Sequence, residues 1–152
     1  MHLKIEKLSP KDVNKLIELI RIFEEVFEMR HFAMPDKNYL QQLLTREDFL
    51  VLVAVLNDNV VGGLTSYILQ QYYSVLPMAY IYDFAVKTNL QRQGIGKLLI
   101  TNLTNYCKSK GFEEVFVQAH KADGHAIEFY RSTGAREEQT VQFYYPLINK
   151  II

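Results

Sequence analysis

The chain has 152 residues, enough for one domain with a full hydrophobic core. Its 17 Lys and Arg residues balance its 17 Asp and Glu residues, and this zero net charge argues against a nucleic-acid binder. The single cysteine, Cys107, excludes an internal disulfide, and no apolar run reaches the length of a membrane span or resembles a signal-peptide core. We therefore expect a cytoplasmic protein with neither nucleic acid nor membrane as a partner.

The spacing of hydrophobic residues predicts the secondary structure in chain order. The expected elements are a strand over residues 3–7, a helix from Ser9 to near Glu28, a helix over 37–45, strands over 48–56, 60–69 and 78–86, a helix over 94–110, a strand over 114–119, a helix over 126–132 and a last strand over 135–145. The order β-α-α-β-β-β-α-β-α-β predicts an α/β fold with a mixed sheet, formed by residues 1–152 as one domain. Residues 78–119 make a βαβ unit, so its two strands should be parallel neighbours. Gly62 and Gly63 indicate a bulge or a close backbone approach.

A glycine-punctuated turn follows the strand over residues 78–86. The segment Gln91-Arg92-Gln93-Gly94-Ile95-Gly96-Lys97, called here the 91–97 loop, opens the next helix. Such a turn aims backbone N–H groups and the positive end of a helix dipole at one point, and Arg92 and Lys97 add full charges, which suits a phosphate. The two glycines are too close together for a Walker loop, and Leu99 stands where a dinucleotide fingerprint needs a third glycine. On this motif alone, a turn that binds nothing is the alternative.

The loop and a later segment together resemble the GCN5-related N-acetyltransferase (GNAT) superfamily. There, Gln-x-x-Gly-x-Gly holds the pyrophosphate of coenzyme A, and a later segment has the spacing seen here in Asp123, Ala126, Ile127, Tyr130 and Gly134, although Asn is more usual at the first position. The resemblance implies helices on both faces of the sheet and acetyl-CoA as cosubstrate. It assigns cofactor binding to Phe84, Ala85, Val86, Gln91, Arg92, Gln93, Gly94, Ile95, Gly96, Lys97, Asp123 and Ala126.

Shorter matches resemble the aminoglycoside 3-N-acetyltransferases of the gentamicin and fortimicin type. They lie in residues 81–86, 92–95, 117–119 and 136–138. In that family several acids follow Gln-Ala and face the polycationic drug, whereas here His120-Lys121-Ala122 intervene and only Asp123 remains. The resemblance therefore supports the fold and the acetyl donor more strongly than it supports an aminoglycoside as the substrate.

Two side chains are candidates for the chemistry. Asp83 interrupts an apolar strand where a buried carboxylate is costly, so we expect it to remove the proton of the acceptor amine or to bind the ammonium. A structural hydrogen-bonding acid is the alternative. Tyr130 matches the superfamily tyrosine beside the CoA sulfur, which implies proton donation to the leaving thiolate; a packed core aromatic is its alternative. The resemblance assigns polarisation of the thioester carbonyl to backbone N–H groups of residues 84–86.

Acidic residues indicate a cationic acceptor, because a cluster of acids attracts and steers amines. A solvated helix end is the alternative for each acid, and a surface histidine is the alternative for His120. The residues expected on the acceptor side are Glu24, Glu25, Glu28, Asp36, Tyr82 and His120. No metal is expected, because the four histidines lack zinc-site spacing. Cys107 falls on the inner helix face and predicts no covalent acyl-enzyme.

These observations predict an enzyme that moves an acetyl group from acetyl-CoA to a primary amine by direct attack. The expected acceptor is a small cationic molecule, with the 3-amino group of an aminoglycoside as one candidate. A polyamine, an amino acid or a protein amine is the first alternative, and a non-catalytic acyl-CoA-binding module is the second. The aromatic residues of the last strand and Tyr72-Tyr73 indicate either a homodimer contact or a lining of the acceptor cleft.

Overall fold

The computed structural model describes residues 2–149, which fall into two compact units. The first unit ends at Gln118 and the second begins at Ala119. Each unit is described by itself, and the single domain expected over residues 1–152 stays a prediction.

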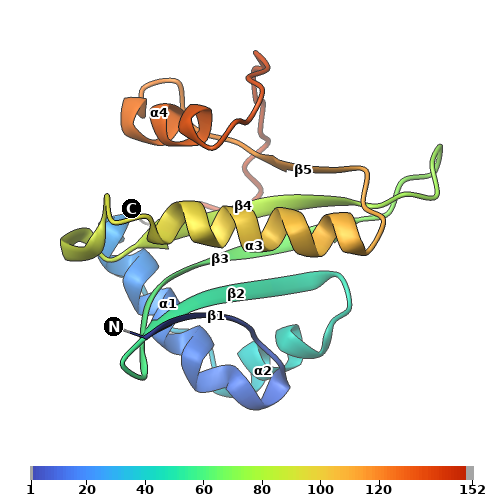
Figure 1. Cartoon of the computed structure of the whole chain (residues 1–152). Helices are drawn as coiled ribbons and strands as arrows, with labels where there is room; N and C mark the ends of the chain where they lie inside the picture. Colours follow the sequence, from blue (N-terminus) through green and yellow to red (C-terminus); the bar gives the residue numbers. More distant parts are fainter. Residues whose placement is uncertain (1, 150–152) are drawn as a thin grey trace. The chain divides into compact units, whose positions relative to one another are not determined.

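The first unit is a five-stranded sheet with helices on both faces (Figure 1). Its elements are β1 (Leu3–Lys7), the 3₁₀ helix η1 (Pro10–Asp12), α1 (Val13–Val26), α2 (Lys37–Thr45), β2 (Phe49–Leu56), β3 (Asn59–Leu69), β4 (Met78–Val86), the 3₁₀ helix η2 (Thr88–Leu90), α3 (Ile95–Ser109) and β5 (Glu114–Val117). The spatial order of the strands, β1-β2-β3-β4-β5, follows the chain. Neighbours from β1 to β4 are antiparallel, and β5 runs parallel to β4 through the α3 crossover. The predicted mixed α/β fold and its βαβ unit are confirmed.

Alternate strand residues build one hydrophobic cluster on each face of the sheet. In β2, Val51 and Val53 belong to the cluster with α1 and α2, whereas Leu50 and Leu52 belong to the cluster with α3. This alternation follows from the two-residue period of a strand. Both faces of the sheet are therefore covered, as the near-continuous apolar run of β2 predicts.

Gly63 allows α1 to lie close against the sheet. A Cβ atom at this position would meet the Leu52 carbonyl oxygen at 2.6 Å and a Leu19 methyl carbon at 2.8 Å. The close approach expected at Gly62 and Gly63 is confirmed, and the β2–β3 register also shifts beside them, after Ala54. Any side chain at Gly63 would push α1 or β2 away from β3.

The second unit contains α4 (Gly124–Ser132). The prediction of a last strand over residues 135–145 is wrong, because these residues have no regular secondary structure. A strand needs a neighbouring strand for its backbone hydrogen bonds, and α4 is the one regular element among the described residues of this unit. The aromatic side chains of the segment are exposed, with Phe143 at 83% and Tyr145 at 89%. High strand propensity alone does not make a strand here.

None of the helices within residues 2–149 combines the length and the apolar composition needed to cross a bilayer.

Candidate active site

An extra residue in β4 shapes the centre of the sheet. Thr65 of β3 pairs with Asp83, but the next residue, Ser66, pairs with Ile81, so Tyr82 is a bulged residue. Side chains of a regular strand alternate between faces, and the extra residue places Tyr82 and Asp83 on the same face. That face is the one covered elsewhere by α1 and α2, because Tyr82 packs edge-on against Tyr67 while Ile81 belongs to the α3 cluster.

Asp83 is half-buried on this face, and burial raises the pKa of its carboxyl above the ordinary value. Its backbone N–H donates a hydrogen bond to Thr65 Oγ1 at 3.3 Å. Within residues 2–149, no hydrogen bond or ion pair of the Asp83 carboxylate is found. A carboxylate that is partly desolvated and not engaged is suited to accept a proton from a ligand.

The two parallel strands stop pairing before β4 ends. The β4–β5 register runs from Met78–Glu114 to Ile81–Val117, whereas β4 stays paired with β3 as far as Val86. Asp83 thus lies just past the point at which the parallel pair ends. In open α/β sheets, ligands bind beyond the carboxyl ends of such strands.

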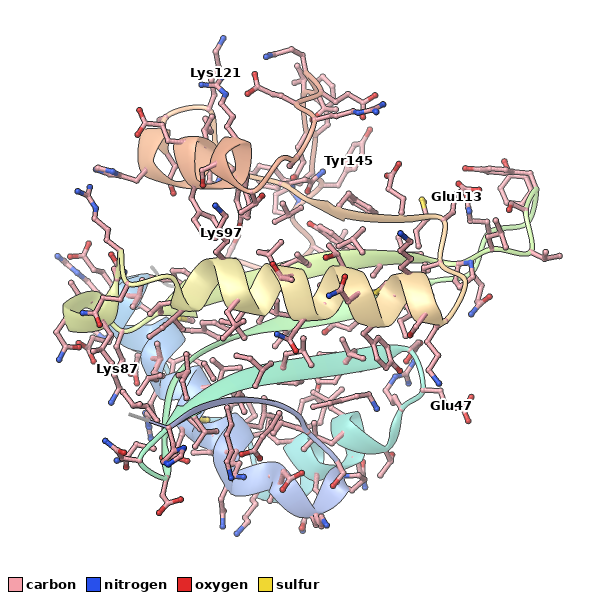
Figure 2. All side chains as sticks on the ribbon, in the orientation of Figure 1. Glu47, Lys87, Lys97, Glu113, Lys121 and Tyr145 are labelled. Carbon is pink, nitrogen blue, oxygen red and sulfur yellow. The ribbon has the colours of Figure 1, made fainter. Side chains whose placement is uncertain are left out.

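The 91–97 loop follows β4 at this end of the sheet and starts α3. Gln91 Nε2 donates to the Val86 carbonyl oxygen at 3.0 Å, which ties the loop to the end of the strand. Gly94 is the N-cap residue of α3 and takes a left-handed conformation with φ of 86°. The first N–H groups of a helix have no acceptor within it, and no side chain caps them here. With Lys97 on the first turn (Figure 2), the loop offers donors, a dipole and a charge that fit a pyrophosphate.

In the second unit, Asp123 is the N-cap residue of α4, and its carboxylate accepts a hydrogen bond from the Ala126 N–H at 3.1 Å. His120 is exposed, and its carbonyl accepts from the Asp123 N–H at 2.9 Å. Burial, followed by the charge of Asp123, raises the pKa of Tyr130 to about 12. The phenol is therefore protonated across the physiological pH range.

The four acids expected on the acceptor side lie near the end of α1 and at the start of α2. Glu24 forms an ion pair with Arg21 at 2.9 Å, and Asp36 is the N-cap residue of α2, accepting from the Asn38 N–H at 3.3 Å. Glu25 and Glu28 are exposed near the end of α1. Two of the four thus have structural partners at helix ends, which agrees with the alternative reading of these residues.

Tyr82, expected on the acceptor side, lies beside aromatic residues that sequence reasoning missed. In the sheet register, Phe49 pairs with Tyr67, Tyr67 with Tyr80, and Tyr80 with Phe116, so one aromatic residue from each of four strands lies in line. Tyr82 packs edge-on against two of them, with ring centroids 5.6 Å from Tyr67 and 6.0 Å from Tyr80. We call these five residues the aromatic row. The two-residue period of each strand predicts which face its aromatic residue occupies, but only the register between the strands shows that the residues are aligned.

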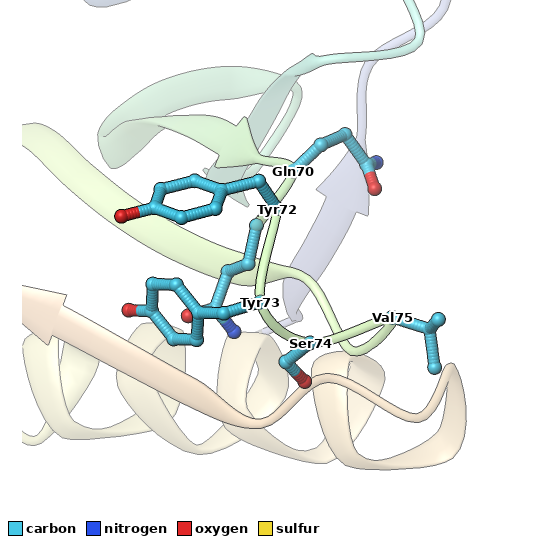
Figure 3. A pocket seen from close by; sticks show the side chains of 6 residues that line it. Gln70, Tyr72, Tyr73, Ser74 and Val75 are labelled. Atoms are coloured by element: carbon cyan, nitrogen blue, oxygen red, sulfur yellow. The ribbon is translucent and has the colours of Figure 1, made fainter.

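Shallow hollows lie near the loop between β3 and β4. Residues 70–75 line one of them, in which the Tyr72 and Tyr73 rings meet edge-on at 5.0 Å (Figure 3). The other is lined by Arg46, Glu47, Asp48 and Gln70. This loop precedes β4, whereas the 91–97 loop follows it, so neither hollow is the predicted pyrophosphate site. In the described part of the chain, no three His, Cys, Asp or Glu residues gather as metal ligands would.

The strand-to-helix loop and the separating parallel strands provide a place for a phosphate-bearing ligand near the half-buried Asp83, an arrangement that suits an acyl-transfer enzyme. Residues 16–135 match the model of the Acetyltransferase (GNAT) family, and the chain belongs to this family. The predicted acetyl-CoA-dependent acetyltransferase class is confirmed.

Three solved structures, of two known proteins, show high similarity to the chain. The crystal structure of the aminoglycoside acetyltransferase meta-AAC0020 from an uncultured soil metagenomic sample, in complex with trehalose, is 59% identical with a TM-score of 0.94, covering 96% of this chain and 97% of that one. The same acetyltransferase has been solved in complex with sisomicin. The aminoglycoside acetyltransferase HMB0005, also from an uncultured soil sample, is 34% identical with a TM-score of 0.89, covering 97% and 100% of the two chains.

A relative with another substrate is more distant. The [ribosomal protein bS18]-alanine N-acetyltransferase of Salmonella typhimurium (strain LT2) is 24% identical over 119 residues, covering 78% of this chain and 70% of that protein. Both kinds of relative are acetyltransferases, so the comparisons agree on the reaction class and differ on the acceptor.

Proposed function

We propose that this acetyltransferase modifies an amine of an aminoglycoside, with the 3-amino group as the expected position. One observation carries the proposal: a protein 58% identical over nearly the whole chain has been solved in complex with sisomicin. At such identity over 96% of the chain, the local geometry around Asp83 is expected to be shared. The 3-position itself rests on the resemblance of residues 81–86 to the gentamicin and fortimicin enzymes.

Asp83 is our candidate for the group that accepts the proton of the attacking amine. Its raised pKa brings it closer to the pKa of a base matched to neutral pH. The amine attacks the thioester carbonyl carbon of acetyl-CoA, the C–S bond breaks, and the proton passes to Asp83 directly or through water. The bulge at Tyr82 supports the assignment, because it turns the carboxylate to the face on which the acceptor would lie.

The 91–97 loop is our candidate for holding the pyrophosphate of the cosubstrate. The backbone N–H groups of Phe84, Ala85 and Val86 are candidates for polarising the thioester carbonyl. Asp123 and Ala126 retain their assignment to cosubstrate binding, and the observed hydrogen bond between them supports a role in shaping the first turn of α4.

Tyr130 is better suited to donate a hydrogen bond than to release its proton. A thiol has a pKa of about 8.5, and a phenol with a pKa near 12 is a much weaker acid. Complete proton transfer from Tyr130 to the leaving thiolate would be uphill, whereas a charge-assisted hydrogen bond stabilises the thiolate as it forms. Tyr130 therefore keeps a catalytic assignment in the proposal, with the thiolate taking its proton from solvent after departure.

Release of the CoA thiol tests the proposal. The purified protein and acetyl-CoA are incubated with sisomicin, with sisomicin already acetylated at the 3-amino group, with spermidine and with an alanine-initiated peptide. We expect turnover of sisomicin and none of its 3-acetylated form, and two-dimensional NMR of the product should show the new amide at that position. Turnover of the blocked drug would reject the position, and absence of turnover on every aminoglycoside would reject the acceptor class.

A protein amine is the second candidate, favoured by the relative that acetylates an alanine of ribosomal protein bS18. It is also favoured by the residues after Ala119, since His120 and Lys121 stand where the drug-modifying family carries acids. Turnover of the alanine-initiated peptide in preference to sisomicin would establish it. We also propose a cytoplasmic homodimer, which analytical ultracentrifugation of the free protein and its CoA complex would test.

A further inference from the structure

The aromatic row forms a continuous surface across four strands on the same face as Asp83. The rings of Phe49 and Tyr67 lie 5.1 Å apart, and those of Tyr80 and Phe116 are stacked at 4.7 Å with an interplanar angle of 6°. Tyr82 meets both inner rings at nearly a right angle. Edge-to-face and stacked pairs at these distances are favourable, so the rings hold one another in place.

The row is open at its centre and polar at its edges. The side chain of Tyr82 is 60% exposed, and the other four members are half-buried. Tyr80 donates its hydroxyl hydrogen to Gln118 Oε1 at 2.8 Å, which fixes that ring at the β5 side. A core aromatic residue would be covered, whereas Tyr82 faces solvent next to the carboxylate of Asp83.

The charges around the row favour a cationic ligand. Burial is the main cause of the raised pKa of Tyr67 and Tyr80, followed by Tyr82 for both and by Tyr39 for Tyr67, and the charge of the nearby Asp83 raises both further. Arg46 is a cation that acts on Tyr67, and its Nε and one terminal nitrogen donate to the two carboxylate oxygens of Asp48, each at 2.8 Å. A cation that reaches the row therefore meets aromatic faces and a carboxylate, with the nearby guanidinium already paired.

We propose that the aromatic row is the binding surface for the acceptor ring. A six-membered amino-substituted cyclitol or pyranose lies with its C–H face on Tyr82 and Tyr67, and its reacting amine points at Asp83. The inference rests on the proposed function and adds the surface that selects the acceptor. Such rings present a flat face of C–H groups together with amines, and an aromatic surface attracts both, through apolar contact and through the attraction of a cation to the ring quadrupole.

A ring fits this surface better than a flexible amine does. A linear polyamine would contact it through one ammonium at a time and would lose chain entropy on ordering. A rigid cyclic acceptor covers adjoining rings without that cost. The row therefore predicts selection for cyclic acceptors over linear ones with the same number of amines.

Substitutions at Tyr82 test the inference, because this ring is exposed and its loss leaves the core intact. We expect Tyr82→Ala to raise the KM for sisomicin about tenfold, the loss of one stacking and cation contact, with the KM for acetyl-CoA unchanged. Tyr82→Phe keeps the ring and should stay within about twofold of the parent. Tyr106→Ala serves as the matched control, since that ring packs with the α3 cluster on the other face.

Saturation-transfer NMR supplies an independent readout on the complex of the protein with CoA and sisomicin. Irradiation of the tyrosine ring protons should transfer to the C–H protons of one cyclitol face, and the transfer should fall in Tyr82→Ala. If the parent enzyme acetylates sisomicin and Tyr82→Ala has the same KM for sisomicin as the parent, the aromatic row is not the acceptor-binding surface, while the proposed function stands. A parent enzyme inactive on all aminoglycosides would instead remove the proposed function, and with it this occupant.

Discussion

Replacing Asp83 with Asn is the sharpest test of the site, because the substitution keeps the shape of the side chain and removes its ability to take a proton. A positioned general base contributes about 10²- to 10⁴-fold to a rate, so we expect kcat for an aminoglycoside to fall by about that factor. The KM for acetyl-CoA should stay unchanged, since the 91–97 loop is anchored to Val86 and not to Asp83. Steady-state kinetics with each substrate varied in turn measures both quantities.

The same substitution should stabilise the fold. Burial raises the native pKa of Asp83 above its ordinary value of 3.8, so the stability that its protonated form contributes is fully present below the unfolded pKa. That contribution is lost as pH rises through the native pKa, and at pH 7 the ionised carboxylate opposes folding. Asparagine stays neutral, so Tm should rise at pH 7, by about 2–4 °C for each kcal/mol regained in a protein of this size. The gain should disappear at pH 3.

Asp58→Asn is the matched control. Asp58 lies exposed in the β2–β3 turn with φ of 65°, a conformation that Asn also tolerates. Neither kcat nor Tm should change in this variant. Full turnover in Asp83→Asn would refute the base assignment, and a rise in the acceptor KM with kcat unchanged would identify Asp83 as an ammonium ligand. A fall in the Tm of Asp83→Asn at pH 7 would refute the prediction that the ionised Asp83 carboxylate destabilises the fold.

The remaining predictions concern the cosubstrate loop, the helix–sheet contact and the leaving group. Gly94→Ala places an L residue at φ of 86°, which costs about 1–2 kcal/mol, and calorimetry should show weaker acetyl-CoA binding although the space around Gly94 is open. Gly63→Ala sets a methyl group 2.6 Å from the Leu52 carbonyl oxygen, so urea unfolding should show a loss of about 1–3 kcal/mol, and an unchanged midpoint would contradict the close packing of α1. Tyr130→Phe removes a hydrogen bond to a forming thiolate and should lower kcat about 10- to 100-fold with no change in the KM of either substrate; an undiminished kcat would remove Tyr130 from catalysis.

The sequence predicts most of the first unit because its elements follow clear periods. The apolar run of β2 and the turn residues after it predict the hairpin, and Gly62 and Gly63 predict the close approach that the structure shows. The last strand fails for a physical reason. Residues 135–145 have strand propensity, but a strand exists only with a hydrogen-bonded neighbour, and propensity does not provide one.

The candidate site is only partly visible in the sequence. The 91–97 loop is local, so spacing alone shows where its donors must point. The aromatic row is non-local: Tyr67 and Phe116 come together through strand register, and the bulge that turns Asp83 to their face appears as no residue pattern at all. The acids expected on the acceptor side stay a prediction, and the structure adds that Glu24 and Asp36 also have partners at helix ends.

An aromatic acceptor surface resolves a conflict that an acidic one would create. Attack on the thioester requires a neutral amine, and carboxylates close to an amine raise its pKa and hold it in the protonated form. Aromatic faces attract a cation more weakly, by about 0.5–1 kcal/mol at exposed sites, so they concentrate the acceptor with less cost to its deprotonation. Asp83 then remains as the carboxylate beside the reacting amine, where its raised pKa favours proton transfer over a permanent ion pair. On this reasoning, the scarcity of acids after Ala119 is compatible with an aminoglycoside acceptor, because the aromatic row does the part of the binding that acids would do at the expense of reactivity.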